Sequence, residues 1–105
     1  MARTLNSLKP FEVTGLIVGA ANKLYLVKAK NRMTDESITV RASAGTKTTE
    51  YEFILNLADF EKSGTKSGWS TDDVIDVSVL GDGFGSAKHT ITSSTGGVKL
   101  SNIAV

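Results

Sequence analysis

Several residue types are absent or scarce in this chain. Its 105 residues contain no cysteine, one proline and one histidine, and 12 basic residues against 11 acidic ones give a formal net charge of +1. Without cysteine the chain forms no disulfide, no zinc–thiolate site and no cysteine nucleophile. A charge this close to zero lacks the basic excess that nucleic acids and anionic membrane surfaces attract. We therefore expect neither of them as a partner.

Long apolar runs are missing as well. The longest ones, such as residues 16–18 and 24–27, are far shorter than the roughly 20 residues that cross a bilayer. The opening segment, residues 1–10, has no apolar stretch of the roughly 7 to 15 residues that a secretory signal needs. We expect a protein that is made in the cytoplasm without a signal peptide and that does not enter a membrane.

The remaining composition is that of a small folded domain. Hydrophobic residues make up 40% of the chain and charged residues 22%, which suffices for one buried core. Residues 1–10 are polar, and we expect them to form a short flexible N-terminal arm. Residues 11–105 are expected to form one domain.

Most apolar segments alternate with polar residues at a period of two, which is typical of strands with one buried face. The clearest case places Tyr51, Phe53 and Leu55 opposite Glu50 and Glu52. Segments rich in Gly, Asn, Asp and Ser separate the runs and favour turns. The pattern predicts an all-β fold, a sandwich or a small barrel, with seven strands at residues 11–18, 24–30, 38–43, 50–57, 74–80, 87–93 and 98–105. Residues 57–62 are equally compatible with a short helical turn.

The segment GDGFG at residues 81–85 is the closest approach to a phosphate-binding loop. Such a loop must open a helix, whereas residues 86–93 alternate as another strand, so the glycines predict a hairpin turn. The single histidine, His89, lies within that strand without a second histidine or any cysteine to complete a metal site or a catalytic triad.

Carboxylates gather in two places. Asp72, Asp73, Asp76 and Asp82 are acidic residues close in sequence, but they lack the spacing of a calcium-binding loop, and capping of loops is the simpler interpretation. Glu50 and Glu52 share one face of a strand, where solvent exposure explains them better than acid–base chemistry. We predict no catalytic residue, no cofactor and no metal ion, and therefore no enzyme.

The only tryptophan, Trp69, lies in a polar loop, SGTKSGWST, at residues 63–71. Two interpretations remain open. A large apolar side chain is usually buried, which would make Trp69 a lid over one end of the core. An exposed tryptophan in a polar loop would instead be a binding anchor for a protein or for a sugar ring.

Three segments resemble a known pattern of strands. Residues 13–17 (VTGLI) resemble an opening V-x-G-x-V strand, residues 49–57 (TEYEFILNL) a G-x-Y-x-F-x-L strand, and residues 73–83 (DVIDVSVLGDG) a D-x-I-x-V-x-V-x-G-x-G strand. In these segments the chain resembles the immunoglobulin-like and transthyretin-like (carboxypeptidase-regulatory type) β-sandwiches. The resemblance implies a single seven-stranded antiparallel immunoglobulin-like sandwich.

Free-standing domains of this kind and size occur as head decoration proteins of tailed phages. The resemblance therefore implies a structural, non-enzymatic virion protein that binds and stabilises an assembled capsid, with the major capsid protein as its partner. The residues expected to contact that partner are Arg3, Leu5, Leu8 and Lys9 of the arm together with Trp69. The alternative is a carbohydrate- or surface-binding module, in which Trp69 stacks on a sugar and Asp72 or Asp73 binds its hydroxyls. In either case an uncovered edge strand could pair two copies into a homo-oligomer.

Overall fold

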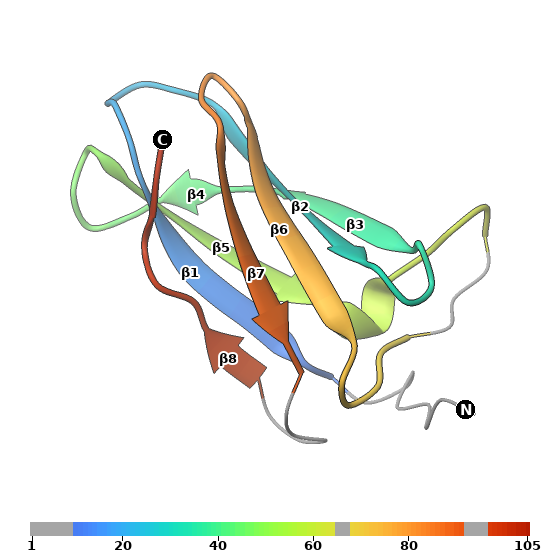
Figure 1. Ribbon diagram of the computed structural model, residues 1–105. Helices are drawn as coiled ribbons and strands as arrows, with labels where there is room; N and C mark the ends of the chain where they lie inside the picture. The colour runs from blue at the N-terminus through green and yellow to red at the C-terminus, as the bar shows by residue number, and fades with distance from the viewer. Residues whose placement is uncertain (1–9, 65–67, 92–96) are drawn as a thin grey trace.

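The computed structural model describes residues 10–64, 68–91 and 97–105, which form an all-β, sandwich-like structure of two sheets (Figure 1). A turn of 3₁₀ helix, Leu57–Asp59, is the only helical element within these ranges, and no helix there is long and apolar enough to span a membrane. The strands in chain order are β1 (Glu12–Val18), β2 (Tyr25–Asn31), β3 (Ser37–Arg41), β4 (Ser43–Ala44), β5 (Glu50–Asn56), β6 (Val74–Gly81), β7 (Gly85–Thr90), β8 (Gly97–Lys99) and β9 (Ile103–Ala104).

The two sheets differ in strand direction. One has the order β3-β2-β6-β7, and all its neighbours are antiparallel. The other has the order β4-β5-β1-β8, and β9 also pairs with β1. In this sheet β5 is antiparallel to β1 and β4, whereas β8 and β9 run parallel to β1. The second sheet is therefore mixed.

The all-β prediction is confirmed, but the expected seven strands in an antiparallel arrangement are wrong in two respects. The run at residues 38–43 divides into β3 and β4 because the chain changes sheets there. Ala42 still donates a backbone hydrogen bond to Tyr25 of β2, and the next residue, Ser43, already pairs with Glu52 of β5.

The run at residues 98–105 is likewise divided, into β8 and β9. Between them the side chain of Leu100 turns into the core, with 9% of its surface exposed, and its N–H donates to the carbonyl of Thr14. Both short strands lie beside β1 and run in its direction, which no local pattern could predict. The predicted strand at residues 87–93 begins earlier, as β7, and its last residues lie outside the described ranges.

Residues 57–62 adopt the helical turn in part. The side chain of Asn56 accepts a hydrogen bond from the N–H of Ala58 at 3.1 Å and so caps the 3₁₀ turn Leu57–Asp59. The chain then leaves the turn at Phe60, whose side chain is fully buried.

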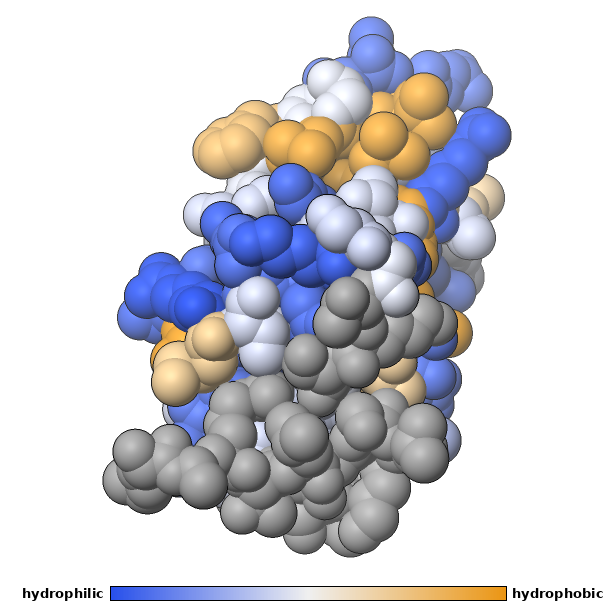
Figure 2. Space-filling view, turned by 90° about the vertical axis from the view of Figure 1, so that its right-hand side faces the viewer, coloured by the Kyte–Doolittle hydropathy of each residue, from blue (hydrophilic) through white to orange (hydrophobic). Residues whose placement is uncertain are grey.

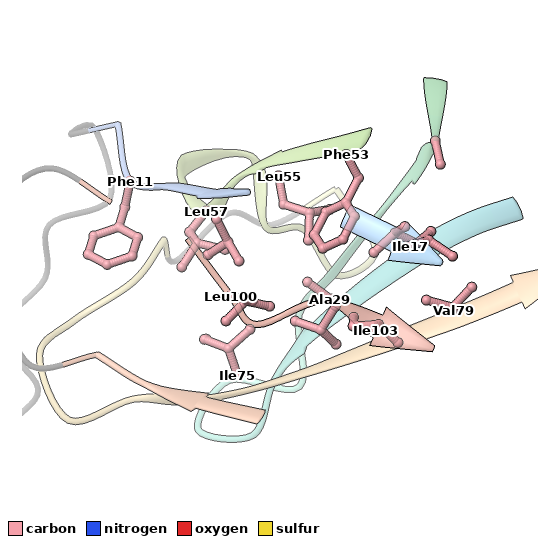
Figure 3. Close-up of a cluster of buried hydrophobic side chains, with 14 of the residues drawn as sticks. Phe11, Ile17, Ala29, Phe53, Leu55, Leu57, Ile75, Val79, Leu100 and Ile103 are labelled. Carbon is pink, nitrogen blue, oxygen red and sulfur yellow. The ribbon is translucent and has the colours of Figure 1, made fainter. Parts of the chain in front are cut away.

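The core lies between the two sheets and consists of the alternating apolar residues (Figure 3). Val13 and Ile17 of β1, Phe53 and Leu55 of β5, and Val77 of β6 are all buried. Each such side chain contributes about 1.5–3 kcal/mol by leaving water. The buried faces of both sheets therefore fix which residues of each strand remain available at the surface.

Candidate partner-binding surface

The structure describes one of the five residues predicted to contact a partner, Trp69. Arg3, Leu5, Leu8 and Lys9 lie outside the described residues. Trp69 is fully buried, with none of its surface exposed, and its ring centroid lies 4.8 Å from that of Phe11. The structure supports the first of the two interpretations of Trp69, in which the side chain is buried as a lid over the core. The assignment of Trp69 as a surface anchor is corrected, because a side chain without exposed surface contacts neither a partner nor a sugar.

The hairpin between β6 and β7 displays a different aromatic residue. Phe84 lies in this turn and exposes 71% of its surface, the largest fraction among the large hydrophobic residues that the structure describes. The GDGFG segment is thus a hairpin turn, as predicted, but its phenylalanine was not recognised as a surface feature. A solvated aromatic ring on a turn is a typical anchor for a protein partner.

Further apolar side chains lie at the same end of the molecule. Leu24 before β2 is 42% exposed, Leu80 on β6 is 36% exposed, and Val18 and Val105 are exposed to similar extents. We call Leu24, Leu80, Val105 and Phe84 the Phe84 patch, whereas Val18 lies on the outer face of the other sheet, opposite Glu50. Figure 2 shows apolar side chains gathered at the upper end of the molecule, where the β6–β7 hairpin lies in Figure 1. Clusters of exposed apolar side chains on a small protein commonly mark interaction sites.

One acidic residue, Asp82, connects the hairpin to the start of β2. The Leu24 N–H donates to Oδ2 of Asp82 at 2.7 Å, and the Asp82 N–H donates to the Leu24 carbonyl at 2.9 Å. These two bonds join the β1–β2 connection to the hairpin that carries Phe84. The exposed ring therefore sits on a turn with little freedom to fold back, which lowers the entropic cost of binding.

Two glycines allow this close approach. Gly81 has a φ of +102°, and a Cβ there would lie 2.6 Å from the Leu24 carbonyl oxygen. At Gly83 a Cβ would lie 2.8 Å from the ring of Tyr25. Any larger residue at either position would push the hairpin away from β2.

A pair of tyrosines supports the patch from below. Tyr25 and Tyr51 pack edge to face at a centroid distance of 4.8 Å. The Tyr51 hydroxyl donates to the Ala20 carbonyl at 2.7 Å and accepts a bond from the Lys23 N–H at 3.1 Å. Both ends of the β1–β2 connection are therefore tied to the core.

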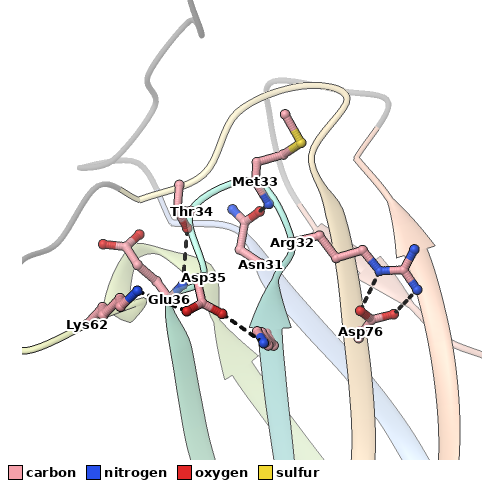
Figure 4. Close-up of polar contacts among 9 residues, drawn as sticks. Asn31, Arg32, Met33, Thr34, Asp35, Glu36, Lys62 and Asp76 are labelled. Atoms are coloured by element: carbon pink, nitrogen blue, oxygen red, sulfur yellow. Dashed lines mark hydrogen bonds and ion pairs between the residues drawn. The ribbon is translucent and has the colours of Figure 1, made fainter.

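The opposite end of the molecule is polar and braced by ion pairs (Figure 4). Asp35 contacts Lys30 at 2.8 Å and Lys62 at 2.9 Å. Hydrogen bonds from Lys30 and then Lys62 lower the pKa of Asp35 to about 2. Arg32 donates two hydrogen bonds to Asp76, at 2.6 and 2.9 Å, and hydrogen bonding from Arg32 lowers the pKa of Asp76.

The carboxylates considered for binding have structural contacts here. Asp73 is buried, and its Oδ2 accepts hydrogen bonds from the Asn31 side chain at 2.8 Å and from the Ser70 N–H at 2.9 Å. Asp72 is exposed, with a φ of +73° in the turn before β6. Within the described ranges no three His, Asp or Glu side chains gather in a way that could hold a metal ion.

His89 lies on β7 and is half-buried, with its ring centroid 6.5 Å from that of Phe11. Glu50 and Glu52 alternate with the buried Tyr51 and Phe53, so both lie on the outer face of the sheet, where Glu50 is half-buried and Glu52 exposed. This arrangement fits the interpretation that the two glutamates belong to the solvent-exposed face of a strand. The Phe84 patch is an exposed feature with the chemistry of a binding site.

Comparisons of the chain with protein-family models, with curated proteins and with solved structures each gave no match.

Proposed function

We propose that this chain is a structural, non-enzymatic interaction protein that binds a protein partner through the Phe84 patch. The observation that carries the proposal is the 71% exposure of Phe84 on a hairpin that Asp82 ties to Leu24. Full burial of one such side chain contributes about 1.5–3 kcal/mol to association. The four exposed apolar residues of the patch thus provide a contact of moderate affinity at one end of the molecule.

In its most concrete form the proposal is a decoration protein of a tailed-phage head. The partner is then the major capsid protein, and the chain is made in the host cytoplasm and carried on the virion. A shell repeats the same binding site many times, so moderate contacts at each copy suffice to stabilise neighbouring capsomers. The arm, residues 1–10, would add further contacts from the end where β1 begins, opposite the β6–β7 hairpin in Figure 1.

The strand pairing supports an immunoglobulin-like fold as part of this proposal. In such sandwiches strand B pairs with E, C with F, and F with G. The pairs β1–β5, β2–β6 and β6–β7 have the same relationship, with β3 added beside β2. The last strands, β8 and β9, then take the place of strand A beside β1, although they run parallel to it.

The carbohydrate-binding alternative has lost its stacking residue, because Trp69 is buried, and one of its polar residues, Asp73, is buried too. No other observation favours that function, so we do not propose it.

The test is to fractionate a lysate of the native source by sedimentation, with mass spectrometry to identify what travels with the chain. We expect the chain in megadalton particles, in fixed ratio to a shell protein. Recovery of the chain only as a free small species would contradict the decoration proposal.

Two variants assign the binding to the patch. Phe84→Ser should abolish co-sedimentation. Met33→Ser, which removes a side chain that is 60% exposed in the β2–β3 turn at the opposite end, should leave it unchanged. Equal loss in both variants would mean that general surface hydrophobicity, and not the Phe84 patch, causes the association.

A further inference from the structure

The outer edge of β3 has open backbone groups. In an antiparallel pair, successive residues point their N–H and C=O groups alternately toward and away from the neighbouring strand. Ala42 donates to Tyr25, and the Glu36 carbonyl accepts from Asn31, so even-numbered residues face β2. Ser37, Thr39 and Arg41 therefore direct their backbone groups away from the sheet.

One residue of the same chain, Glu61, already pairs with this edge. Ser37 and Glu61 form an isolated antiparallel bridge, with N–H to carbonyl distances of 3.1 and 3.3 Å in the two directions. Beyond this bridge, toward the end of β3, no described residue pairs with the backbone of Thr39 or Arg41 on that side. The edge is thus occupied at Ser37, whereas at Thr39 and Arg41 it has no backbone partner within the described residues.

A groove lies beside the open part of the edge. Its volume is about 360 Å³, and it runs between the margins of the two sheets. Ile54 of β5 borders it and is 58% exposed. The complete lining is Ser37, Ile38, Thr39, Val40, Ile54, Asn56, Asp59 and Glu61. The apolar members are in position to contact a side chain from an added strand.

The ionisable side chains that line the groove are all acidic. Asp59 and Glu61 are its only ionisable lining residues, and both come from the segment that follows β5. No basic side chain lines it. An occupant with a basic residue at the Ser37 end would therefore be favoured over a neutral or acidic one.

We propose that the β3 edge and its groove bind an extended polypeptide segment of a partner protein, which adds as a short strand. Its backbone would exchange hydrogen bonds with Thr39 and Arg41. One apolar side chain would enter the groove beside Val40 and Ile54, and a basic side chain would lie near Asp59 and Glu61. This is strand addition, in which the backbone provides affinity and alternate side chains provide specificity. The site is separate from the Phe84 patch, and its test does not depend on a capsid.

A second copy of this chain is a poorer occupant than a short foreign segment. If two β3 strands paired around Val40, Thr39 of one copy would face Arg41 of the other. The residues of that other copy from Ala42 onward would then overlap the position beside Ser37 that Phe60 and Glu61 of the first copy already occupy. A segment of a few residues can end or turn away before this point.

The experiment uses short synthetic peptides and the full chain. The probes are acetyl-Ser-Val-Thr-Val-Arg-amide and its reversed sequence, which cover both strand directions. Amide ¹H–¹⁵N shifts are followed during titration. We expect saturable shifts centred on Thr39 and Arg41, and slower hydrogen exchange of those two amides. Replacing arginine by glutamate in the peptide should weaken binding, and methylating the peptide backbone nitrogens should abolish it.

Matched protein variants separate backbone pairing from other effects. Thr39→Pro removes an outward N–H, which an edge strand tolerates, and should abolish binding, whereas Thr39→Val keeps the N–H and should bind normally. Asp59→Asn combined with Glu61→Gln should weaken binding by roughly threefold, in the range of exposed ion pairs, while Glu12→Gln should not.

Three outcomes would overturn the inference. The first is the absence of shifts at Thr39 and Arg41 at millimolar concentrations of both peptides. The second is equal binding of the backbone-methylated peptide. The third is a shift of the same amides with protein concentration alone, which would identify a second copy as the occupant.

Discussion

Asp82 and Leu24 are joined twice, although 58 positions separate them in the chain. The carboxylate of Asp82 accepts from the Leu24 N–H at 2.7 Å, and its own N–H donates to the Leu24 carbonyl at 2.9 Å. These bonds connect the two loops that carry the most exposed apolar side chains of the patch. The Phe84 patch depends on this link for its shape.

Removing the carboxylate should loosen the patch without unfolding the protein. Asp82→Ala loses the shorter of the two bonds, and a single hydrogen bond to an exposed charged group contributes about 1 kcal/mol. We expect a decrease of this size in the free energy of unfolding in urea, and faster hydrogen exchange at Leu24. The control is Glu12→Ala, an exposed carboxylate on β1, which should change neither quantity. Unchanged exchange at Leu24 in Asp82→Ala would show that the hairpin is held by other contacts.

The buried state of Trp69 has a direct spectroscopic consequence. The chain has one tryptophan, so its fluorescence reports on this residue alone. We expect weak quenching by acrylamide, and an emission maximum that moves to longer wavelength only on unfolding. Trp69→Ala should lower the free energy of unfolding by about 3–5 kcal/mol because it leaves a cavity beside Phe11. Met33→Ala, at an exposed position, should change it by less than about 0.5 kcal/mol.

Strand positions could be predicted from the sequence where one face of a strand is buried throughout. In β5, Tyr51, Phe53 and Leu55 lie two residues apart and are all buried, so their spacing identifies the buried face although the exposed Ile54 between them is apolar. At Ala42 the same alternation continues although the chain passes from one sheet to the other. Ala42 stays buried, and the next residue, Ser43, already pairs with Glu52 of the second sheet. The parallel pairing of β8 and β9 with β1 joins opposite ends of the chain, and nothing local encodes it.

The candidate site was harder to predict because the sequence left the position of Trp69 open and assigned no surface role to Phe84. Trp69 lies in a long connection between β5 and β6, which has enough length to fold back over the core. Phe84 lies in a tight hairpin, where the chain reverses within a few residues and the ring stays 71% exposed. The length of each connection was the available signal. A large apolar residue in a short glycine-rich turn has to point outward, whereas one in a long loop can be buried.

The interior packing at Gly15 leads to another prediction. Gly15 lies opposite Phe53 in the β1–β5 ladder, and a Cβ there would lie 2.7 Å from Cζ of the ring. Gly15→Ala should therefore cost about 1–3 kcal/mol by overpacking, measured as a decrease in the free energy of unfolding. In a Phe53→Leu background the same substitution should cost less, because the shorter side chain leaves room. Equal costs in both backgrounds would mean that the ring does not cause the destabilisation.

Acid should weaken the polar end of the molecule through Asp35. Its pKa falls from the ordinary value of 3.8 to about 2 because Lys30 and Lys62 hydrogen-bond to the carboxylate. A carboxyl group whose pKa is lower in the folded state binds its proton first in the unfolded state. Its contribution to stability is therefore complete above about pH 4 and is lost as the pH falls toward 2.

This contribution can be isolated with Asp35→Asn. Asparagine tolerates the positive φ of +60° at this position but does not titrate. The difference in free energy of unfolding between the wild-type chain and Asp35→Asn should shrink as the pH falls from 5 to 2. The other acid-sensitive pair, Arg32 with Asp76, is present in both proteins and cancels. Because the side chains of Lys30 and Asp35 are about half exposed, 1 M salt should reduce the difference at pH 5. Parallel stability curves for the two proteins over this pH range would mean that the ion pairs do not stabilise the fold.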